Sequence, residues 1–164
     1  MTDDLKKTLS EQFQREFHAS YLYLGMAAYA LHKELKGFGR FFLKQSEEER
    51  EHAMRLFHYL LDRDILLHPL PIEAPTVDFP SILECFRRAY AYEQSISQSY
   101  YNLLEKARGW KDADLEEFVW WYIREQREEE ATMRSWVERL TLAGNDGAAI
   151  LLLDRQAGKE AEEE

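Results

Sequence analysis

The sequence predicts an all-α fold, a four-helix bundle with one long crossover and a short fifth helix at the C-terminus. Three observations support this prediction. All four prolines lie between residues 69 and 80, and most glycines separate long stretches without proline. Four of these stretches carry apolar residues at alternating steps of three and four, the spacing of one buried helix face. The length of 164 residues is typical of a single domain.

The first helix is expected from about residue 3 to residue 34. Its core-facing positions are Leu5, Leu9, Gln12, Glu16, Ala19, Tyr23, Met26 and Ala30. A short turn at Lys36-Gly37 follows, so the second helix should return antiparallel to the first and end near Asp64. Its core-facing positions are Phe38, Phe42, Gln45, Glu49, His52, Leu56 and Tyr59.

The proline-bearing segment, about residues 65–79, is too long for a tight turn. It can run the length of a bundle, which makes the third helix parallel to the second. Ser81 is the expected N-cap of the third helix, with Glu84 three residues later, and the helix should end near residue 108, before Gly109. Its core-facing positions are Ile82, Phe86, Ala89, Glu93, Ile96, Tyr100, Leu103 and Ala107.

The fourth helix is expected from about Asp112 to Leu142. Its core-facing positions are Leu115, Val119, Tyr122, Gln126, Glu129, Met133, Trp136 and Leu140. A short apolar piece, residues 148–153, follows two glycines and forms the fifth helix. Residues 157–164 are rich in glutamate and predict a disordered tail, so we expect the domain to span residues 1–156.

The charge balance excludes some classes of partner. The chain has 31 acidic and 21 basic residues, a net charge of −10, and a nucleic-acid partner is not expected. The acidic N-terminus predicts no signal peptide, and no apolar stretch has the length of a membrane-spanning helix. The single Cys85 cannot form an internal disulfide, which suits a reducing cytoplasm. We therefore expect a cytoplasmic protein.

The core-facing positions of each expected helix form one row along it. Each of the four rows is interrupted once, near its middle, by residues of the types that bind metals. In an antiparallel-type bundle the middles of the helices lie at one level, so these side chains should meet there. The interrupting residues are Glu16 in the first helix, Glu49 and His52 in the second, Glu93 in the third, and Gln126 and Glu129 in the fourth.

Four carboxylates at one level of a core would repel one another, and desolvation would raise their pKa values. None of the four rows contains a lysine or arginine to neutralise them, so either several are protonated or cations lie among them. Carboxylate oxygens with one imidazole suit iron or manganese, and zinc competes for such sites. Without a thiolate on any row, an iron–sulfur cluster is excluded.

Taken singly, each of these residues has an ordinary explanation. A lone mid-helix glutamate such as Glu16 or Glu93 is most often a surface residue, and a lone His52 most often a hydrogen-bonded core histidine. The run Glu128-Glu129-Glu130 is ordinarily a solvated face. Four independent rows interrupted at one level are hard to obtain by chance, and we interpret them together as a metal site.

The chain resembles the ferritin-like di-iron proteins, which place a Glu on each of two helices and a Glu-x-x-His on each of the other two. Glu49-x-x-His52 fits this pattern, whereas Gln126-x-x-Glu129 replaces the second Glu-x-x-His. That departure resembles bacterial non-haem ferritin. The blocks that carry the resemblance are Glu16-Phe-His-Ala-Ser-Tyr-Leu-Tyr23, Glu48-Glu-Arg-Glu-His52, Glu125-Gln-Arg-Glu-Glu129 and Leu140-Thr-Leu-Ala-Gly144.

The resemblance implies a ferroxidase centre that holds two irons per subunit. By analogy, the first iron is held by Glu16, Glu49 and His52. The second is held by Glu49, Glu93 and Glu129, with Gln126 close by. A third iron nearby would take Glu48, Glu125 and Glu128 and share Glu129.

The resemblance also implies the reaction and the assembly. Fe(II) is oxidised in pairs by dioxygen or peroxide, and Fe(III) passes to a mineral inside a hollow homo-oligomer of twenty-four subunits, whose fourfold channels the fifth helix lines. Glu49, His52 and Tyr23 are the residues expected to carry the reaction. Tyr23 and Trp121 match aromatic residues that donate electrons, and plain core packing explains both equally well.

Three alternatives remain open at the level of sequence. A bacterioferritin would have a haem-ligating Met where this chain has Arg50, and a His where it has Glu129, so no haem is expected. A monomeric or dimeric di-iron oxidase acting on an organic substrate would differ in assembly size. A structural bundle with protonated carboxylates would bind no metal.

Overall fold

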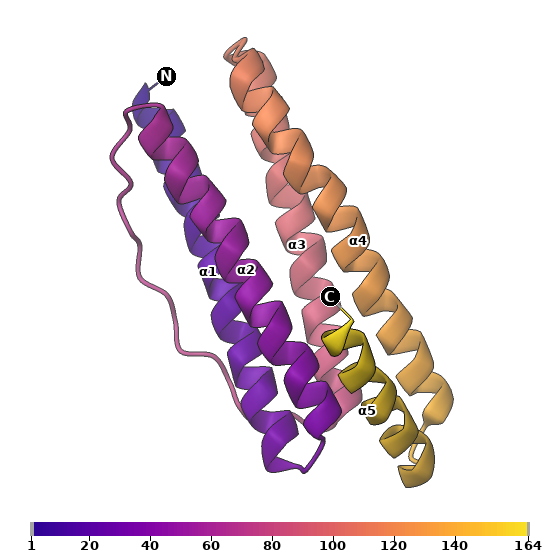
Figure 1. The fold of residues 1–164 in the computed structure, drawn as a ribbon. Helices are drawn as coiled ribbons and strands as arrows, with labels where there is room; N and C mark the ends of the chain where they lie inside the picture. Colours follow the sequence, from indigo (N-terminus) through magenta and orange to yellow (C-terminus); the bar gives the residue numbers. More distant parts are fainter. Residues whose placement is uncertain (1, 164) are drawn as a thin grey trace.

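The computed structural model describes residues 2–163, and this part of the chain contains helices and no strand (Figure 1). The predicted all-α bundle with a short C-terminal helix is confirmed. Each helix boundary lies within about two residues of its expected position, the usual uncertainty of helix ends, apart from the end of the last helix. The helices are α1 (Thr2–His32), α2 (Lys36–Asp62), α3 (Ile82–Gly109), α4 (Ala113–Ala143) and α5 (Gly147–Glu162).

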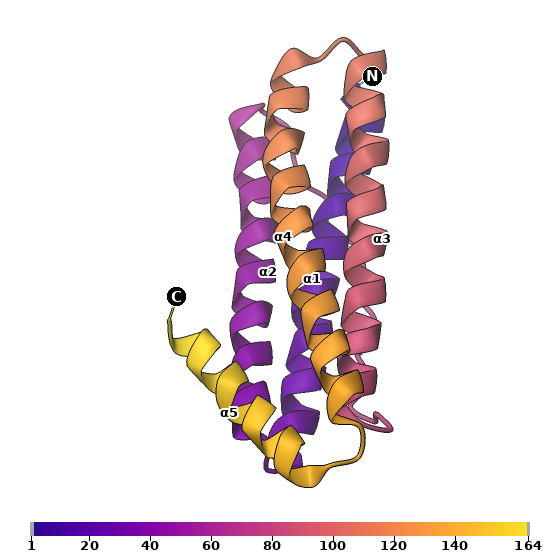
Figure 2. The same ribbon diagram turned by 90° about the vertical axis from the view of Figure 1, so that its right-hand side faces the viewer.

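The four long helices form two antiparallel pairs, α1 with α2 and α3 with α4 (Figures 1 and 2). Because the connection between α2 and α3 runs back along the whole bundle, α2 and α3 point in the same direction, as the sequence predicted. Helix α5 turns back from the end of α4 and packs mainly on α2, with the C-terminus about halfway along the bundle. Within residues 2–163, no helix combines the length and apolar character needed to cross a membrane.

Polar side chains fix the starts of α3 and α4. The hydroxyl of Ser81 accepts a hydrogen bond from the backbone N–H of Glu84 at 3.2 Å, and the carboxylate of Asp112 accepts one from Leu115 at 3.0 Å. These bonds satisfy backbone donors that have no partner inside the helix, which is why such residues favour the N-cap. The capping residues therefore set where each helix of the second pair begins.

The crossover lies on α1 and is held by apolar anchors and one polar contact. The side chains of Ile65, Leu67 and Phe79 are buried. The side chain of Gln14 donates a hydrogen bond from Nε2 to the carbonyl of Pro71 at 2.6 Å. The proline-bearing crossover is thus fastened to the bundle at both ends and in the middle.

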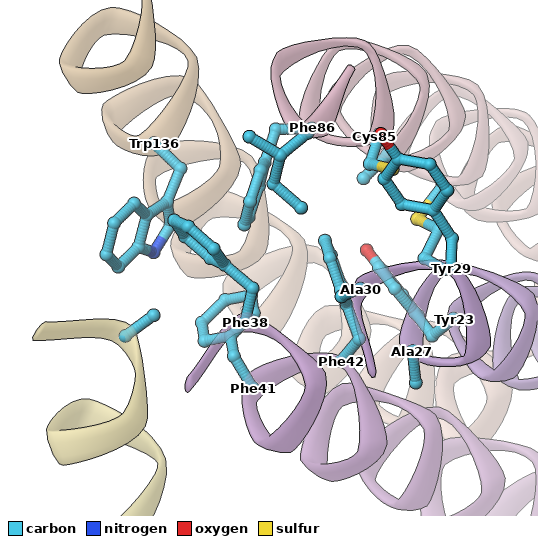
Figure 3. Packing of buried hydrophobic residues seen from close by; sticks show 14 of the residues in the cluster. Tyr23, Ala27, Tyr29, Ala30, Phe38, Phe41, Phe42, Cys85, Phe86 and Trp136 are labelled. Carbon is cyan, nitrogen blue, oxygen red and sulfur yellow. The ribbon is translucent and has the colours of Figure 1, made fainter. Parts of the chain in front are cut away.

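The core is divided into two apolar clusters by the level at which the polar residues meet. One cluster lies toward the α1–α2 turn, where Phe38, Phe42, Phe86 and Trp136 pack edge-on and stacked (Figure 3). The other lies toward the opposite end, around residues such as Leu56, which is fully buried. The two clusters hold the helices rigidly on both sides of the polar level.

Every core-facing position predicted for the four long helices is buried except Tyr59. Tyr59 is half-buried because its hydroxyl donates to Oδ2 of Asp114 at 2.9 Å while its ring stacks on Phe118 with a centroid distance of 3.8 Å. Leu60, the next residue, takes the fully buried place. A tyrosine with one wet end therefore sits at the margin of the core.

The prediction of a disordered tail from residue 157 is wrong for the part that the structure describes. Helix α5 continues to Glu162, and Ala157 and Gly158 are buried against α2. Basic side chains of the bundle offset the acidic tail: Lys44 Nζ donates to the carbonyl of Ala161 at 3.1 Å, and Arg139 lies 3.4 Å from Glu160. Composition alone predicted disorder because it does not show these partners. Glu164 lies outside the described residues.

Close packing of two glycines brings α5 onto the start of α2. A Cβ added to Gly37 would collide with the backbone carbonyl of Asp154, and one added to Gly158 would collide with Arg40. The same approach lets the carboxylate of Asp154 accept a hydrogen bond from the backbone N–H of Phe38 at 2.8 Å. Helix α5 thereby supplies the cap that α2 lacks, since the residue at its own N-cap, a leucine, has no polar side chain.

We predict that Gly37→Ala loosens α5. The added methyl group meets backbone that cannot rotate away, so the free energy of unfolding should fall by about 1–3 kcal/mol. Gly109→Ala is the matched control, because a Cβ there meets nothing within 4 Å, and we expect it to change the free energy by about 0.5 kcal/mol or less. Thermal denaturation of both variants is the measurement, and equal melting temperatures would contradict the close approach.

Candidate metal centre

The candidate centre is a set of polar side chains that all four long helices bring together at mid-height. Each helix contributes one core-facing position, and α2 and α4 contribute a second one three residues away, on the same helix face. All six side chains are buried, although five of them can ionise. They are Glu16 of α1, Glu49 and His52 of α2, Glu93 of α3, and Gln126 and Glu129 of α4.

The potential ligand atoms form two groups of three that share Glu49. One atom each of Glu16, Glu49 and His52 lies within 4.8 Å of the others, and the same holds for Glu49, Glu93 and Glu129. In the first group, Nδ1 of His52 is 3.3 Å from Oε2 of Glu49 and 3.7 Å from Oε2 of Glu16. Two adjoining groups with a common carboxylate have the form of a two-metal site.

Hydrogen bonds hold Glu16 and Glu93 in place. The hydroxyl of Tyr100 donates to Oε1 of Glu16, and the hydroxyl of Tyr23 donates to Oε1 of Glu93 at 2.7 Å. Nε2 of Gln126 donates to Oε2 of Glu93 at 2.9 Å. Such contacts orient carboxylates before any cation arrives, as outer contacts do in metal sites.

Glu49 differs from the other three carboxylates. Glu129 is held through Oε2, which accepts a hydrogen bond from Nε2 of Gln45 at 2.9 Å. Both oxygens of Glu49, by contrast, are buried without a hydrogen-bond partner among residues 2–163. A carboxylate with both oxygens free, placed between two groups of ligands, is suited to bridge two cations.

Burial and mutual repulsion keep protons on part of the centre when no metal is bound. Desolvation, followed by the charges of Glu93 and Glu16, raises the pKa of Glu49 well above its usual range. Desolvation and the charge of Glu93 likewise raise the pKa of Glu129 to about 8. The metal-free centre therefore avoids holding all its carboxylates ionised together.

His52 and Glu16 form the charged pair of the metal-free centre. Burial alone would lower the pKa of the imidazole. The contact with Glu16 and the charges of the other acids together outweigh burial and raise that pKa to about 9. Burial would also raise the pKa of Glu16, yet the contacts with His52, Glu49 and Tyr100 outweigh it and lower that pKa. A cation bound here would replace the proton of His52.

The donor set fits a pair of iron or manganese ions. Among the described residues, buried atoms without a hydrogen-bond partner include Oε2 of Glu16, both oxygens of Glu49, Nδ1 of His52 and Oε1 of Gln126. Orphaned buried lone pairs are costly, and a bound cation would satisfy them. Carboxylate oxygens with one imidazole are typical ligands of these metals, and zinc competes for them.

An acidic groove of about 710 Å³ connects the centre to solvent between α2, α4 and the end of α5. His52 and Glu129 line it from the buried side, and Glu48, Glu125 and Glu128 line it as well. Of the residues predicted for a third site, the structure brings Glu125 and Glu129 together with His52, within 4.8 Å. It does not include Glu48 and Glu128 in that group.

The two aromatic residues that the sequence analysis named lie on different sides of the centre. Tyr23 is buried, and its hydroxyl reaches the centre through Glu93. Trp121 is half-buried in the groove, with its ring edge-on to His52 at a centroid distance of 5.5 Å. The guanidinium of Arg55 lies 3.7 Å from the centroid of Trp121.

Sequence reasoning placed Tyr100 and Gln45 on core-facing positions but gave them no part in the centre. Their spacing along the chain could have indicated a role in the centre. Tyr100 follows Glu93 by seven residues, and Gln45 precedes Glu49 by four. Both spacings put a hydrogen-bond donor on the same face as a carboxylate, one or two turns away. Which carboxylate each one reaches depends on the neighbouring helix.

A four-helix bundle whose middle gathers glutamates and a histidine into two groups with a shared carboxylate defines the class of dimetal-carboxylate proteins. The comparison with protein families narrows this class. The family model described as "Ferritin-like domain" matches residues 6–143. The chain belongs to the ferritin family.

Individual relatives agree with this assignment over almost the whole chain. The bacterial non-heme ferritin of Staphylococcus aureus (strain MRSA252) is 35% identical over 158 residues, which cover 96% of this chain and 95% of that protein. The bacterial non-heme ferritin of Staphylococcus epidermidis is 36% identical over 156 residues, with coverages of 95% and 94%. The open-pore ferritin of Archaeoglobus fulgidus superposes with a TM-score of 0.94 at 34% identity, covering 96% of this chain and 98% of that one.

The raised pKa values predict how the stability of the metal-free protein depends on pH. The pKa of Glu129 is raised from 4.5 to about 8 and that of His52 from 6.5 to about 9. Between each pair of values the folded chain binds more protons than the unfolded chain, so the free energy of unfolding should fall as pH rises through both windows.

Denaturant titrations of chelator-treated protein across this pH range measure the effect. Glu129→Gln should make the decline shallower, because it removes one of the groups whose raised pKa contributes to it. Glu128→Gln, a change of the exposed neighbour, is the control and should leave the slope as it is. A free energy of unfolding that rises with pH across both windows would contradict this account of the centre.

Proposed function

We propose that the protein stores and detoxifies iron. It oxidises Fe(II) with dioxygen or peroxide at the two-metal centre and passes Fe(III) to a mineral held inside a cage of twenty-four copies. The observation that carries the proposal is the pair of ligand groups joined by Glu49, beside an acidic groove. Membership of the ferritin family and similarity to bacterial non-heme ferritins support it.

Each ligand has a role in binding the two substrate ions. Glu16, Glu49 and His52 hold the first Fe(II), and Glu49, Glu93 and Glu129 hold the second. Gln126 keeps Glu93 oriented and presents its own carbonyl oxygen, which has no hydrogen-bond partner among the described residues. A third ion takes Glu48, Glu125 and Glu128 and shares Glu129.

Charge balance explains both binding and release. Two Fe(II) ions bring four positive charges, which the four carboxylates of Glu16, Glu49, Glu93 and Glu129 offset in a buried site. Oxidation adds two positive charges that these ligands do not balance. The groove carries further carboxylates from Glu48, Glu125 and Glu128, so the ferric product is drawn toward the groove.

The chemistry of the groove favours storage over the oxidation of an organic substrate. Its wall includes Glu48, Glu51 and Glu125 together with charged side chains of α5, and such a surface attracts cations. An oxidase that retains its iron would need a pocket shaped for an organic molecule, which is typically apolar with few polar groups. Arg50 at the place of a haem-binding methionine also disfavours the bacterioferritin alternative.

We place the reaction in the cytoplasm, because the only cysteine, Cys85, is buried as a free thiol. Tyr23 is proposed to act beside Glu49 and His52 by fixing Glu93 and by donating an electron. The hydrogen bond between Tyr23 and Glu93 supports the first of these roles directly.

Substituting the shared ligand should abolish the fast reaction. In Glu49→Gln and in His52→Ala the initial rate of Fe(II) oxidation should fall by at least about 100-fold. Loss of a contact that only supports a ligand costs up to about that much, and loss of the ligand itself should cost no less. Stopped-flow absorbance after mixing anaerobic Fe(II) with aerobic protein measures it. Glu47→Gln, an exposed change on the same helix, is the control, and oxidation at the normal rate in both test variants would refute the assignment.

The fifth helix provides a test of assembly. Leu151 and Leu152 are 60% and 67% exposed in the single chain. Two adjacent exposed leucines indicate a surface that contacts another subunit. We expect the double variant Leu151→Asp, Leu152→Asp to prevent or weaken cage formation, because charge buried between subunits costs several kcal/mol.

Light scattering coupled to size-exclusion chromatography reports the assembly size directly. Gln156→Asp adds a charge on the same helix without removing apolar surface and should form cages like the unchanged protein. Leu153 is left unchanged, because it packs against the core of its own subunit. Cages of normal size and heat stability from the double variant would show that these leucines stay in solvent.

A further inference from the structure

A second cleft lies where the crossover returns to the end of the bundle that holds the α1–α2 turn (Figure 1). The end of α1, residues 77–80 of the crossover and the first turns of α3 enclose it. Its volume is about 810 Å³, which suits a small molecule. It shares no lining residue with the acidic groove or the metal centre. We call it the basic cleft.

The charge of the basic cleft is opposite to that of the whole chain. His32, Lys33 and Arg88 line it together with one acid, Asp78, whereas the chain has a net charge of −10. The helix dipole of α1 accounts for bases at its C-terminal end. It does not account for Arg88, which a different helix brings to the same cleft. A locally basic cleft on an acidic protein attracts anions.

The side chains of Lys33 and Arg88 have no acidic partner. Nζ of Lys33 lies 6.0 Å from the ring centroid of Tyr29, and Cζ of Arg88 lies 5.1 Å from that of Phe79. Within residues 2–163, neither side chain forms a hydrogen bond or an ion pair. Arg87, by contrast, lies 2.7 Å from a carboxylate of its own helix. The donors of the cleft are therefore available to a ligand.

The rest of the lining is mainly apolar. Tyr29 and Phe79 are buried at the base of the cleft, with ring centroids 5.4 Å apart and an edge-on arrangement. Val77 is 52% exposed and forms part of the wall. A ligand that fills the cleft therefore needs an apolar body as well as a negative charge.

The crossover wall is held in place without a ligand. The backbone N–H of Asp78 donates to Oγ1 of Thr76 at 3.0 Å. A Cβ added to Gly25 of α1 would collide with the carbonyl of Thr76, so the crossover lies tightly on α1 just before the cleft. A preformed wall lowers the entropic cost of binding, because the ligand does not have to order it.

We propose that the basic cleft binds a small aromatic phosphate, a flat ring that carries one phosphate group. A phosphate monoester has a charge of about −1.5 to −2 at neutral pH, which matches the two permanent charges of Lys33 and Arg88 better than a single carboxylate does. The imidazole of His32 supplies a further N–H donor. The ring lies against Val77 and the accessible edges of the two aromatic residues.

Flavin mononucleotide is a suitable probe, because it joins a fluorescent ring to one phosphate group. Equilibrium dialysis against the assembled, iron-free protein avoids binding of phosphate to a mineral. We expect saturable binding of one molecule per subunit. Riboflavin lacks the phosphate and inorganic phosphate lacks the ring, so each should bind at least about 10-fold more weakly than the probe.

Substitutions in the cleft should change the affinity in opposite directions. Arg88→Gln should weaken binding of flavin mononucleotide by about 10-fold or more, because one charged hydrogen bond is lost. Asp78→Asn should tighten it several-fold, because the one negative charge of the cleft is removed. Arg87→Gln is the matched control, since Arg87 is also exposed but does not line the cleft, and it should leave the affinity unchanged.

Thermal denaturation provides a second readout. The probe binds only the folded chain, so it should raise the melting temperature of the unchanged protein and of Arg87→Gln, and raise that of Arg88→Gln much less. Equal shifts in all three proteins would overturn the assignment.

Three further results would overturn the proposal. Riboflavin or inorganic phosphate could bind as tightly as the probe, or Asp78→Asn could bind it more weakly. An Arg88→Gln protein that no longer reaches the normal assembly size would show that the cleft is a contact between subunits instead. None of these measurements uses Fe(II), so a failure of ferrous oxidation would count against the proposed function alone.

Discussion

The structure depends on the burial of four glutamates at one level of a helical bundle. Like charges in a water-poor core repel strongly, and each carries a desolvation cost of several kcal/mol. The chain keeps them together by packing two aromatic-rich clusters on either side, so the helices cannot separate at the middle without breaking both. Without a cation, the repulsion is reduced by protons held on Glu49, Glu129 and His52.

Hydrogen bonds restrain three of the four buried carboxylates and leave Glu49 unrestrained. Tyr100 fixes one oxygen of Glu16, and Gln45 fixes one oxygen of Glu129. Glu49 receives no such bond within the described residues and can turn both oxygens toward cations. The asymmetry between one free carboxylate and three restrained ones is what makes a two-metal arrangement more suitable here than a single site.

The acidic groove connects the centre to solvent on one side of the bundle. Helix α5 closes one end of it, where Glu160 of its last turn and Glu163, the residue that follows the helix, contribute to the lining. Lys44 and Arg139 hold that turn in place, so an acidic tail becomes part of a defined surface. Negative charge increases from the centre toward the groove, and under the proposed function this gradient would draw Fe(II) in and Fe(III) out.

The sequence determined the four helices, their faces and the level at which the buried polar side chains meet, because a period of 3.6 residues fixes which side chains share a face. Glu16, Glu49, His52, Glu93 and Glu129 were all assignable in this way. Tertiary structure decided which donor reaches which carboxylate, as with Tyr100 and Glu16, and it ordered the tail through α2. These contacts join residues far apart in the chain, and their partners depend on helix rotation and register, which periodicity along one helix does not specify.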